Sequence, residues 1–169
     1  MTPVIRFEST ADIPAVRIVN ELAFGRSLEA DIVDALRSHE KVLVSLVALV
    51  EGQIVGHALF SRATIHSDGG LLIEAALGPL AVIPEQQRRG IGSALVQKGL
   101  AECRRRGFGS LFLLGSPAYY GRFGFRPAPE FGIRYAQALS NEDAFQVVEL
   151  WKGALRGVRG IAHEEPELG

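Results

Sequence analysis

The segment Leu80–Ser93, with the sequence LAVIPEQQRRGIGS, constrains the fold of this chain more than any other. A short apolar strand runs into a polar loop with two arginines and two glycines, and a long helical pattern begins at Gly90. A helix N-terminus presents unpaired N–H groups and a partial positive charge, so it binds anionic phosphate. Gly90 and Gly92 lack the Cβ atoms that would keep a diphosphate away from these amides, and Arg88 and Arg89 can add charge-assisted contacts. The sequence therefore predicts a phosphate-binding turn between a strand and a helix.

Two well-known nucleotide-binding loops can be tested against this spacing. A Walker loop needs a glycine, four residues and then Gly-Lys-Ser or Gly-Lys-Thr, and the sequence contains no such string. A Rossmann fingerprint needs three spaced glycines after the first strand of a β-α-β unit, and the third glycine is missing here. Both loops are therefore disfavoured.

The periodicity of the apolar residues predicts helices and strands on both sides of this turn. Thr10 or Asp12 can cap a first helix, and Gly25 ends it. The turn Glu51-Gly52 joins two apolar runs into a hairpin. The other expected elements are helices at Leu28–Arg37, Gly90–Arg106 and Pro117–Arg122, strands at Val4–Phe7, Val42–Val50, Ile54–Phe60, Leu71–Val82, Ser110–Leu114 and Ala144–Trp151, and a strand that begins at Phe123–Phe125.

Glycine and proline also predict where regular structure is interrupted. Gly78-Pro79 falls inside an expected strand, and such a pair usually marks a bulge or a close approach to the backbone. Ala144–Trp151 is expected to be the last strand, and the Gly-rich and then acidic stretch that follows to be partly irregular. We expect one mixed α/β domain over residues 1–169, with a core at about 3–151 and a tail at 152–169.

Composition excludes several classes of protein. A length of 169 residues suffices for a core without metal or disulfide support, and one cysteine excludes an intramolecular disulfide and a cysteine-based zinc cage. The formal net charge of −1 gives no strong attraction to nucleic acid or a membrane. No apolar run approaches the ~20 residues of a membrane helix, and no secretory signal is evident, so a cytoplasmic protein is expected. The late strand and the Gly-rich tail are compatible with a homodimer.

The predicted turn resembles motif A of the GNAT superfamily of N-acetyltransferases, Gln/Arg-x-x-Gly-x-Gly/Ala, through Gln87, Gly90 and Gly92. The strand just before it, the proline in the loop and the long helix just after it agree with that motif. A second block, Tyr119–Phe125, is similar to the family's Tyr-x-x-x-Gly-Phe signature. It follows one helix and one strand later, as the family's topology requires, and the resemblance extends more weakly over most of the chain.

The resemblance implies a GNAT-type acyl-CoA N-acyltransferase fold of the α/β (α+β) class, in which a mixed central sheet, flanked by helices, splays around the cofactor. The co-substrate would be acetyl-CoA, with CoA as product and no metal. Backbone groups of Leu80, Ala81 and Val82 would pair with the pantetheine amides, and an N–H near Val82 would polarise the thioester carbonyl. The remaining residues implied to hold the cofactor are Gln87, Arg88, Arg89, Gly90, Ile91, Gly92 and Ser93.

The implied reaction is transfer of the acetyl group to a primary amine of a small molecule or protein by direct attack on the thioester. The ammonium must lose a proton, and the departing thiolate benefits from gaining one. Tyr120 aligns with the family's tyrosine that serves as general acid; a packed aromatic that caps the short helix is the alternative. Glu74 is a candidate base, and its alternatives are a solvated carboxylate at a strand end and proton loss through ordered water.

The family acts on many amines, so the acceptor is not readable from these motifs. A non-catalytic acyl-CoA-binding or sensing module and a transferase for longer acyl chains remain alternatives. His57 is interpreted as a hydrogen-bonded structural histidine rather than a base, and Cys103 as a buried apolar side chain. Arg104–Arg106 complements a helix dipole, with the adenosine 3′-phosphate as an alternative contact. His39, His66 and His163 are interpreted as surface residues without metal-ligand spacing, and Ser116 and Tyr119 as contacts of the acceptor or packing residues.

Overall fold

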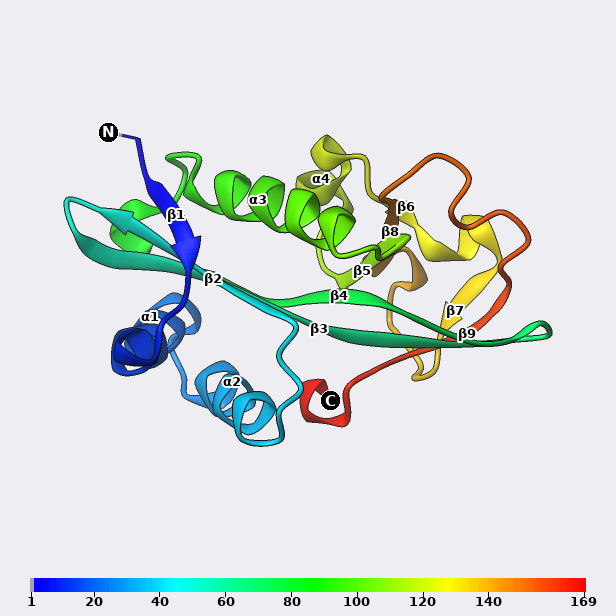
Figure 1. Cartoon of the computed structure of the whole chain (residues 1–169), viewed down its shortest axis with the longest axis horizontal. Helices are drawn as coiled ribbons and strands as arrows, with labels where there is room; N and C mark the ends of the chain where they lie inside the picture. The colour runs from blue at the N-terminus through cyan, green and yellow to red at the C-terminus, as the bar shows by residue number, and fades with distance from the viewer. Residues whose placement is uncertain (1) are drawn as a thin grey trace.

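The computed structural model describes residues 2–169, which form a nine-stranded mixed sheet with helices on both faces (Figure 1). The strands are β1 (Val4–Phe7), β2 (Val44–Val50), β3 (Gln53–Ser67), β4 (Gly70–Val82), β5 (Ser110–Leu114), β6 (Arg126–Pro127), β7 (Ile133–Tyr135), β8 (Phe145–Glu149) and β9 (Gly160–Glu164). The helices are α1 (Ile13–Phe24), α2 (Leu28–Ser38), α3 (Ile91–Arg105) and α4 (Pro117–Tyr120). Short 3-10 turns lie at Thr10–Asp12, Pro84–Gln86, Gly121–Phe123, Ala128–Phe131, Glu142–Ala144 and Pro166–Leu168.

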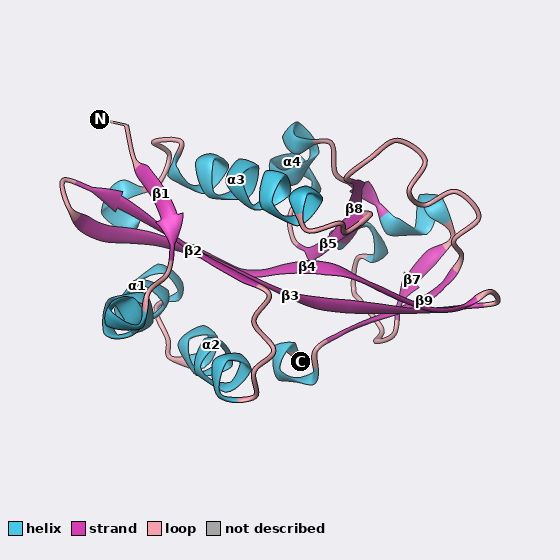
Figure 2. Cartoon of the chain, viewed as in Figure 1, coloured by secondary structure: helices cyan, strands magenta, loops and turns pink. Residues whose placement is uncertain are grey.

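The sheet separates two pairs of helices. Figure 2 shows α1 and α2 on one face and α3 and α4 on the other. The strand order is β1-β2-β3-β4-β5-β8-β6, and β9 pairs with both β3 and β7. The pairs β4–β5 and β7–β9 are parallel, and the others are antiparallel. The long strand β3 pairs with β2 along Gln53–Phe60 and with β9 along Ala63–Ser67, so β9 continues the sheet where β2 ends.

Local signals explain both ends of α1. The Ser9 amide donates to the Asp12 carboxylate at 2.7 Å, and the Arg6 guanidinium donates to the same carboxylate at 2.6 Å. This carboxylate occupies the N-terminus of the helix, where the dipole favours negative charge. At the other end Gly25 adopts a left-handed φ of +69° and donates its N–H to the Glu21 carbonyl. Glycine takes this conformation without a steric penalty, so the helix ends where the sequence predicts.

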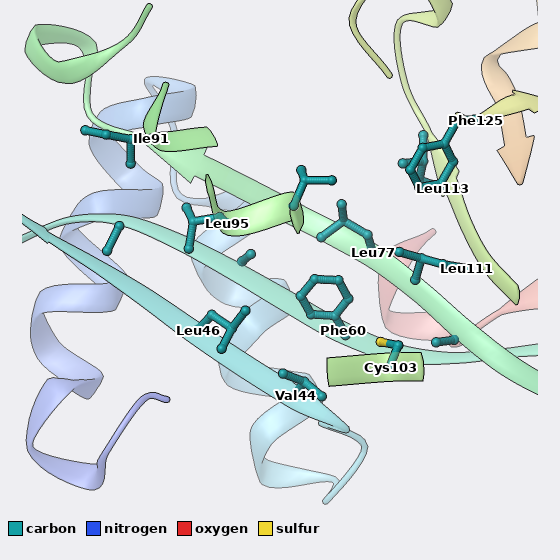
Figure 3. Close-up of a cluster of buried hydrophobic side chains, with 14 of the residues drawn as sticks. Val44, Leu46, Phe60, Leu77, Ile91, Leu95, Cys103, Leu111, Leu113 and Phe125 are labelled. Atoms are coloured by element: carbon teal, nitrogen blue, oxygen red, sulfur yellow. The ribbon is translucent and has the colours of Figure 1, made fainter. Parts of the chain in front are cut away.

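An apolar cluster beneath α3 holds the helix on the sheet (Figure 3). Phe60 from β3 is fully buried in it, together with Leu95 and Cys103 from α3. The Phe60 ring lies directly against the α3 backbone, because a Cβ at Gly99 would stand only 2.0 Å from its Cζ atom. The close approach of α3 to β3 therefore depends on the missing side chain of Gly99.

A Gly99→Ala variant is expected to lower the stability of the protein. Alanine is favoured over glycine inside a helix by about 1 kcal/mol, but the added methyl group overlaps the Phe60 ring, and overpacking typically costs about 1–3 kcal/mol. The denaturant concentration at the midpoint of unfolding should fall in Gly99→Ala. A second substitution, Phe60→Leu, in the Gly99→Ala protein should restore part of the loss. Gln97→Ala, at an exposed site of α3, is the control and should be neutral. A higher midpoint for Gly99→Ala would contradict this packing.

Most of the predicted elements are present at the expected residues, and one prediction was wrong near the second motif. Phe123–Phe125 was expected to begin a strand, but Phe123 ends a 3-10 turn and Gly124 caps it with a left-handed φ of +92°. The strand begins only at Arg126 as the short β6. A left-handed residue ends the turn and redirects the chain, so the apolar side chain of Phe125 packs into the core from irregular backbone.

The second wrong prediction concerns the end of the chain. Ala144–Trp151 was expected to be the last strand, whereas β8 covers Phe145–Glu149 and β9 follows it. Residues beyond 151 thus contribute a strand to the sheet, and Ala162 is buried in a second apolar cluster with Ile65. The turns between β8 and β9 are irregular, as expected for a Gly-rich stretch.

Candidate active site

The neighbouring parallel strands β4 and β5 separate partway along their length. They pair only at Ala75–Leu111 and Ala76–Phe112. Beyond this point β4 pairs with β3 alone and β5 with β8. The register of β4 against β3 skips Gly78-Pro79, so β4 bulges where the gap opens. The splayed mixed sheet and the bulge are both confirmed.

The last residues of β4 present backbone groups to the open side of this gap. The Ile83 N–H donates to the Val55 carbonyl of β3 at 2.9 Å. Because successive residues of an antiparallel strand alternate in direction, Ala81 also bonds toward β3, and the N–H and C=O groups of Leu80 and Val82 point away from it. Leu80 and Val82 thus keep the orientation that a strand-like ligand needs. The backbone groups of Ala81 are taken by β3, against the expectation.

The turn between β4 and α3 folds back onto the strand. The Gln87 side-chain amide donates to the Val82 carbonyl at 2.9 Å, and Arg88 and Gly90 adopt left-handed φ values of +63° and +82°. The first bond of α3 runs from the Ala94 N–H to the Gly90 carbonyl at 3.0 Å. Within residues 2–169, the amides of residues 88–93 donate no hydrogen bond. The turn therefore presents a continuous run of unpaired donors at the positive end of the helix dipole.

A cleft of about 580 Å³, which we call the loop cleft, lies over this turn. Tyr119 from α4 reaches across the start of α3, where its hydroxyl would be 2.8 Å from a Cβ on Gly92. The Arg122 guanidinium lies 4.6 Å from the centre of the Tyr119 ring and adds positive charge. The loop cleft is lined by Leu80, Val82, Gln86, Gln87, Arg88, Gly90, Gly92, Ser93, Tyr119 and Arg122.

A second cleft, of about 260 Å³, lies toward α1, α2 and the end of the chain, and we call it the C-terminal cleft. Leu80 lines both clefts, so they adjoin where β4 leaves β5. The C-terminal cleft is lined by Phe24, Glu29, Ile32, Leu77, Gly78, Pro79, Leu80, Leu114, Tyr120, Glu164 and Leu168.

Tyr120 lines the C-terminal cleft, and its ring packs edge-on against neighbouring aromatic rings. Its ring centre lies 4.8 Å from that of Tyr119 and 5.8 Å from that of Phe125. Burial raises the pKa of Tyr120 to about 12, and the neighbouring Tyr119 acts in the same direction. The phenol therefore remains protonated at neutral pH and is able to donate a proton.

Residues 4–128 of the chain match the family model of the acetyltransferase (GNAT) domain. The chain therefore belongs to the GNAT family of acetyltransferases, as its two motifs indicated. Two relatives from Escherichia coli K12 are similar in sequence. The uncharacterized N-acetyltransferase YhbS is 34% identical over 158 residues, which cover 93% of this chain and 93% of YhbS. The uncharacterized N-acetyltransferase YjhQ is 42% identical over 119 residues, which cover 69% of this chain and 66% of YjhQ.

Two solved structures resemble the whole chain. The E. coli GNAT family N-acetyltransferase YhbS in complex with CoA has a TM-score of 0.92 and 32% identity, over 98% of this chain and 91% of that one. A GNAT family acetyltransferase from Brucella melitensis in complex with acetyl-CoA has a TM-score of 0.80 and 32% identity, over 99% of both chains. The splayed sheet is thus shared with two proteins whose structures contain the CoA moiety.

Glu74, the candidate base, lies away from both clefts. It sits near the start of β4, about 20 Å along the strand from Leu80 at the usual rise per residue. Its carboxylate accepts hydrogen bonds from the Ser110 hydroxyl and, at 3.3 Å, from the Gly109 amide. Burial raises the pKa of Glu74, and these donors oppose the shift. Glu74 therefore joins β4 to the start of β5, and we do not propose it as the base.

The side chains interpreted as structural are engaged in packing and hydrogen bonds. His57 is fully buried, accepts from Asn20 at Nδ1 (3.1 Å) and contacts the Ser45 hydroxyl at Nε2 (2.9 Å), and burial lowers its pKa to about 3. It is therefore neutral and structural. Cys103 is fully buried, and burial raises the pKa of its thiol to about 12, so it is no nucleophile. His39, His66 and His163 are exposed.

The basic run Arg104–Arg106 lies at the opposite end of α3 from the turn, about 20 Å away at the helical rise. Arg105 and Arg106 pair with Glu102, at 2.5 and 2.9 Å, and Arg104 donates to the Leu150 carbonyl at 2.5 Å. These contacts fix the helix end. Residues 2–169 include no group of three or more His, Cys, Asp or Glu side chains able to hold a metal, and over the same range no helix is long and apolar enough to cross a membrane.

Sequence reasoning missed the residues that β9 and the chain end bring to the site. Glu164 and Leu168 line the C-terminal cleft, although they follow the residues expected to form the core. Glu29 joins them from α2. The sequence signal for β9 was weak, because Gly160–Glu164 is too short a stretch to distinguish from an irregular tail.

Proposed function

We propose that this protein is an N-acetyltransferase that moves the acetyl group of acetyl-CoA to a primary amine by direct attack on the thioester. One observation carries the proposal: the unpaired amides of residues 88–93 continue directly from the free edge of β4. A CoA molecule needs both features, because its diphosphate requires donors and its pantetheine carries amides that can extend a strand. The CoA and acetyl-CoA complexes of the two structural relatives support the same co-substrate.

In this proposal the loop cleft takes the nucleotide half of acetyl-CoA. The turn residues Arg88–Ser93 bind the diphosphate, and Gln87 holds the turn against β4 through the Val82 carbonyl. Leu80 and Val82 pair with the pantetheine as a neighbouring strand would. The Val82 N–H then lies where it can donate to the thioester oxygen, whose negative charge grows as the amine adds.

Tyr120 is proposed to protonate the leaving sulfur. The lone pair of the neutral amine forms a bond to the thioester carbon, the C–S bond breaks, and the thiolate takes the phenolic proton. The proton that the nitrogen loses on becoming an amide balances the one that Tyr120 gives. A protonated phenol is needed for this step, and burial keeps Tyr120 in that form.

Turnover of acetyl-CoA with a panel of primary amines tests this function, with the free thiol of CoA as the readout. The expected result is thiol release that depends on both substrates, together with the acetylated amine by mass spectrometry. A different result would favour a binding or sensing module instead: acetyl-CoA binds by calorimetry, but no amine releases thiol above the hydrolysis background. Longer acyl thioesters in the same assay measure the chain-length preference.

A further inference from the structure

The end of the chain is held firmly against the sheet and forms one wall of the C-terminal cleft. Strand β9 pairs with β3 and β7. Beyond it, Glu165 pairs with Lys41 at 3.2 Å and with Arg62 at 3.1 Å, and Glu167 pairs with Lys41 at 3.0 Å. These contacts place Leu168 in the cleft opposite α2. The cleft is therefore a built pocket rather than a gap beside a loose terminus.

Glu164 is the last residue of β9, where it lies opposite Ala63 of β3 and lines the cleft together with Tyr120. No ion pair within residues 2–169 includes its carboxylate. The Tyr135 hydroxyl from β7 donates toward it. A carboxylate without a basic partner, in the same cleft as Tyr120, is able to receive a cation.

The other charged groups around this carboxylate are already neutralised or are themselves acidic. Glu29 from α2 lines the cleft and forms an ion pair with Arg26 at 2.5 Å. Arg62 from β3 is engaged by Glu165. No lining residue of the cleft is basic. A positively charged acceptor is thus favoured over an acidic one.

The rest of the cleft is apolar. Phe24, Ile32, Leu77, Leu114 and Leu168 contribute hydrocarbon to its walls. Its volume of about 260 Å³ suits a small molecule or the end of one side chain. Such a pocket binds an apolar body and uses its few polar groups to orient the ligand.

We propose that the acceptor is a primary amine on an apolar body, and that the Glu164 carboxylate binds its ammonium group and removes one proton from it. This inference rests on the proposed acetyl transfer. The ammonium gives one proton to Glu164, which passes it to solvent, and the freed lone pair forms the C–N bond. The second proton leaves nitrogen as the C–S bond breaks and balances the proton that sulfur takes from Tyr120. One ammonium and one thioester thus give one amide, one thiol and one proton.

Burial shifts the titration of the Glu164 carboxyl toward neutral pH. It raises the pKa of this carboxyl to about 7, while the Tyr135 hydroxyl opposes the shift. A base must be unprotonated, so activity should be lost as the pH falls through about 7. Above that pH the carboxylate is present, and the ammonium substrate persists up to its own pKa near 10. The two groups therefore have their reactive forms together between about pH 7 and pH 10.

The test is the pH dependence of kcat/KM for phenethylamine with acetyl-CoA, from pH 5.5 to 9.5, in the wild type and in Glu164→Gln. In the wild type, kcat/KM should rise about tenfold per pH unit up to about pH 7 and then level off. We call this change of slope the break. In Glu164→Gln, kcat/KM should be about 100-fold lower at pH 8, which is the usual size of a general-base effect. It should rise without a break as the pH approaches the pKa of the amine. Glu164→Asp should retain the break at reduced rate.

Glu142→Gln is the matched control, since it removes an exposed carboxylate that lies outside the cleft and forms no ion pair within residues 2–169, and it should leave the break in place. Calorimetry with acetyl-CoA should give the same Kd in all four proteins. A break near pH 7 that persists in Glu164→Gln would overturn only the role of Glu164 as the base. Faster turnover of glutamate than of phenethylamine would overturn the acceptor class. Acetyl-CoA binding without thiol release from any amine would overturn the acetyl transfer itself, and this inference with it.

Discussion

A Gly90→Asp variant is expected to bind acetyl-CoA about 100-fold more weakly than the wild type while keeping its fold. No atom lies within 4 Å of a Cβ at Gly90, and aspartate is among the residues that tolerate the left-handed φ of +82°. The new carboxylate would stand at the mouth of the diphosphate site. Two like charges 5 Å apart at an effective dielectric constant of 20 repel by about 3 kcal/mol, which is on the order of 100-fold in Kd. Calorimetry measures the loss, and circular dichroism checks the fold.

Gly90→Asn separates charge from shape in this experiment. Asparagine has nearly the same size as aspartate and also tolerates the left-handed region, but it brings no charge. We expect it to weaken binding much less than aspartate does. Equal losses of acetyl-CoA affinity in the two variants would mean that the size of the side chain at position 90, and not its charge, controls binding at the turn. Unchanged affinity in Gly90→Asp would remove the assignment of the turn to a diphosphate.

Tyr120→Phe is expected to lower kcat by about 100-fold with little change in the Kd of acetyl-CoA. The phenyl ring can keep the packing that Tyr120 makes with Phe125 and beside Gly115, so only the proton donor is lost. General acid catalysis of this kind contributes roughly 100-fold to 10,000-fold. Because the pKa of Tyr120 is about 12, its own titration should not appear below pH 9.5, and the break near pH 7 should remain in the residual activity.

The matched control is Tyr119→Phe, which removes the adjacent phenol from the loop cleft. Tyr119 lies over the start of α3, so this change should affect the affinity for acetyl-CoA more than kcat. A Tyr120→Phe enzyme with wild-type turnover would reassign Tyr120 to packing. A larger loss of kcat in Tyr119→Phe would move the acid to that residue.

The turn at Gln87–Ser93 was predictable because its chemistry is local. Glycine at 90 permits the left-handed backbone, glutamine at 87 reaches the carbonyl at the end of the preceding strand, and the helix begins directly afterwards. All of these relations span a few residues. The same holds for the bulge at Gly78-Pro79 and for the helix stop at Gly25.

The proposed proton acceptor was not predictable in this way. Glu74 was named because it lies on the strand that leads to the predicted cofactor site, where some family members carry their base. The length of β4 places it far from the turn, where Ser110 binds it. Glu164 was overlooked because its place depends on pairing between β9 and β3, elements that are far apart in the chain. Neither hydropathy nor spacing encodes such a pairing, and an acidic, Gly-rich terminus normally indicates solvent exposure.

The sharing of Leu80 by the two clefts has a consequence for the order of events in turnover. The loop cleft is lined by residues of α3 and α4, and the C-terminal cleft by residues of α1 and α2 together with Tyr120 of α4. Helices α3 and α4 lie on one face of the sheet and α1 and α2 on the other (Figure 1). With acetyl-CoA in the loop cleft and the amine in the C-terminal cleft, as we propose, each substrate has its own entrance, and neither must depart before the other arrives. Initial-rate plots at several fixed concentrations of the second substrate should accordingly give intersecting lines, and parallel lines would indicate an acetylated enzyme between two half-reactions.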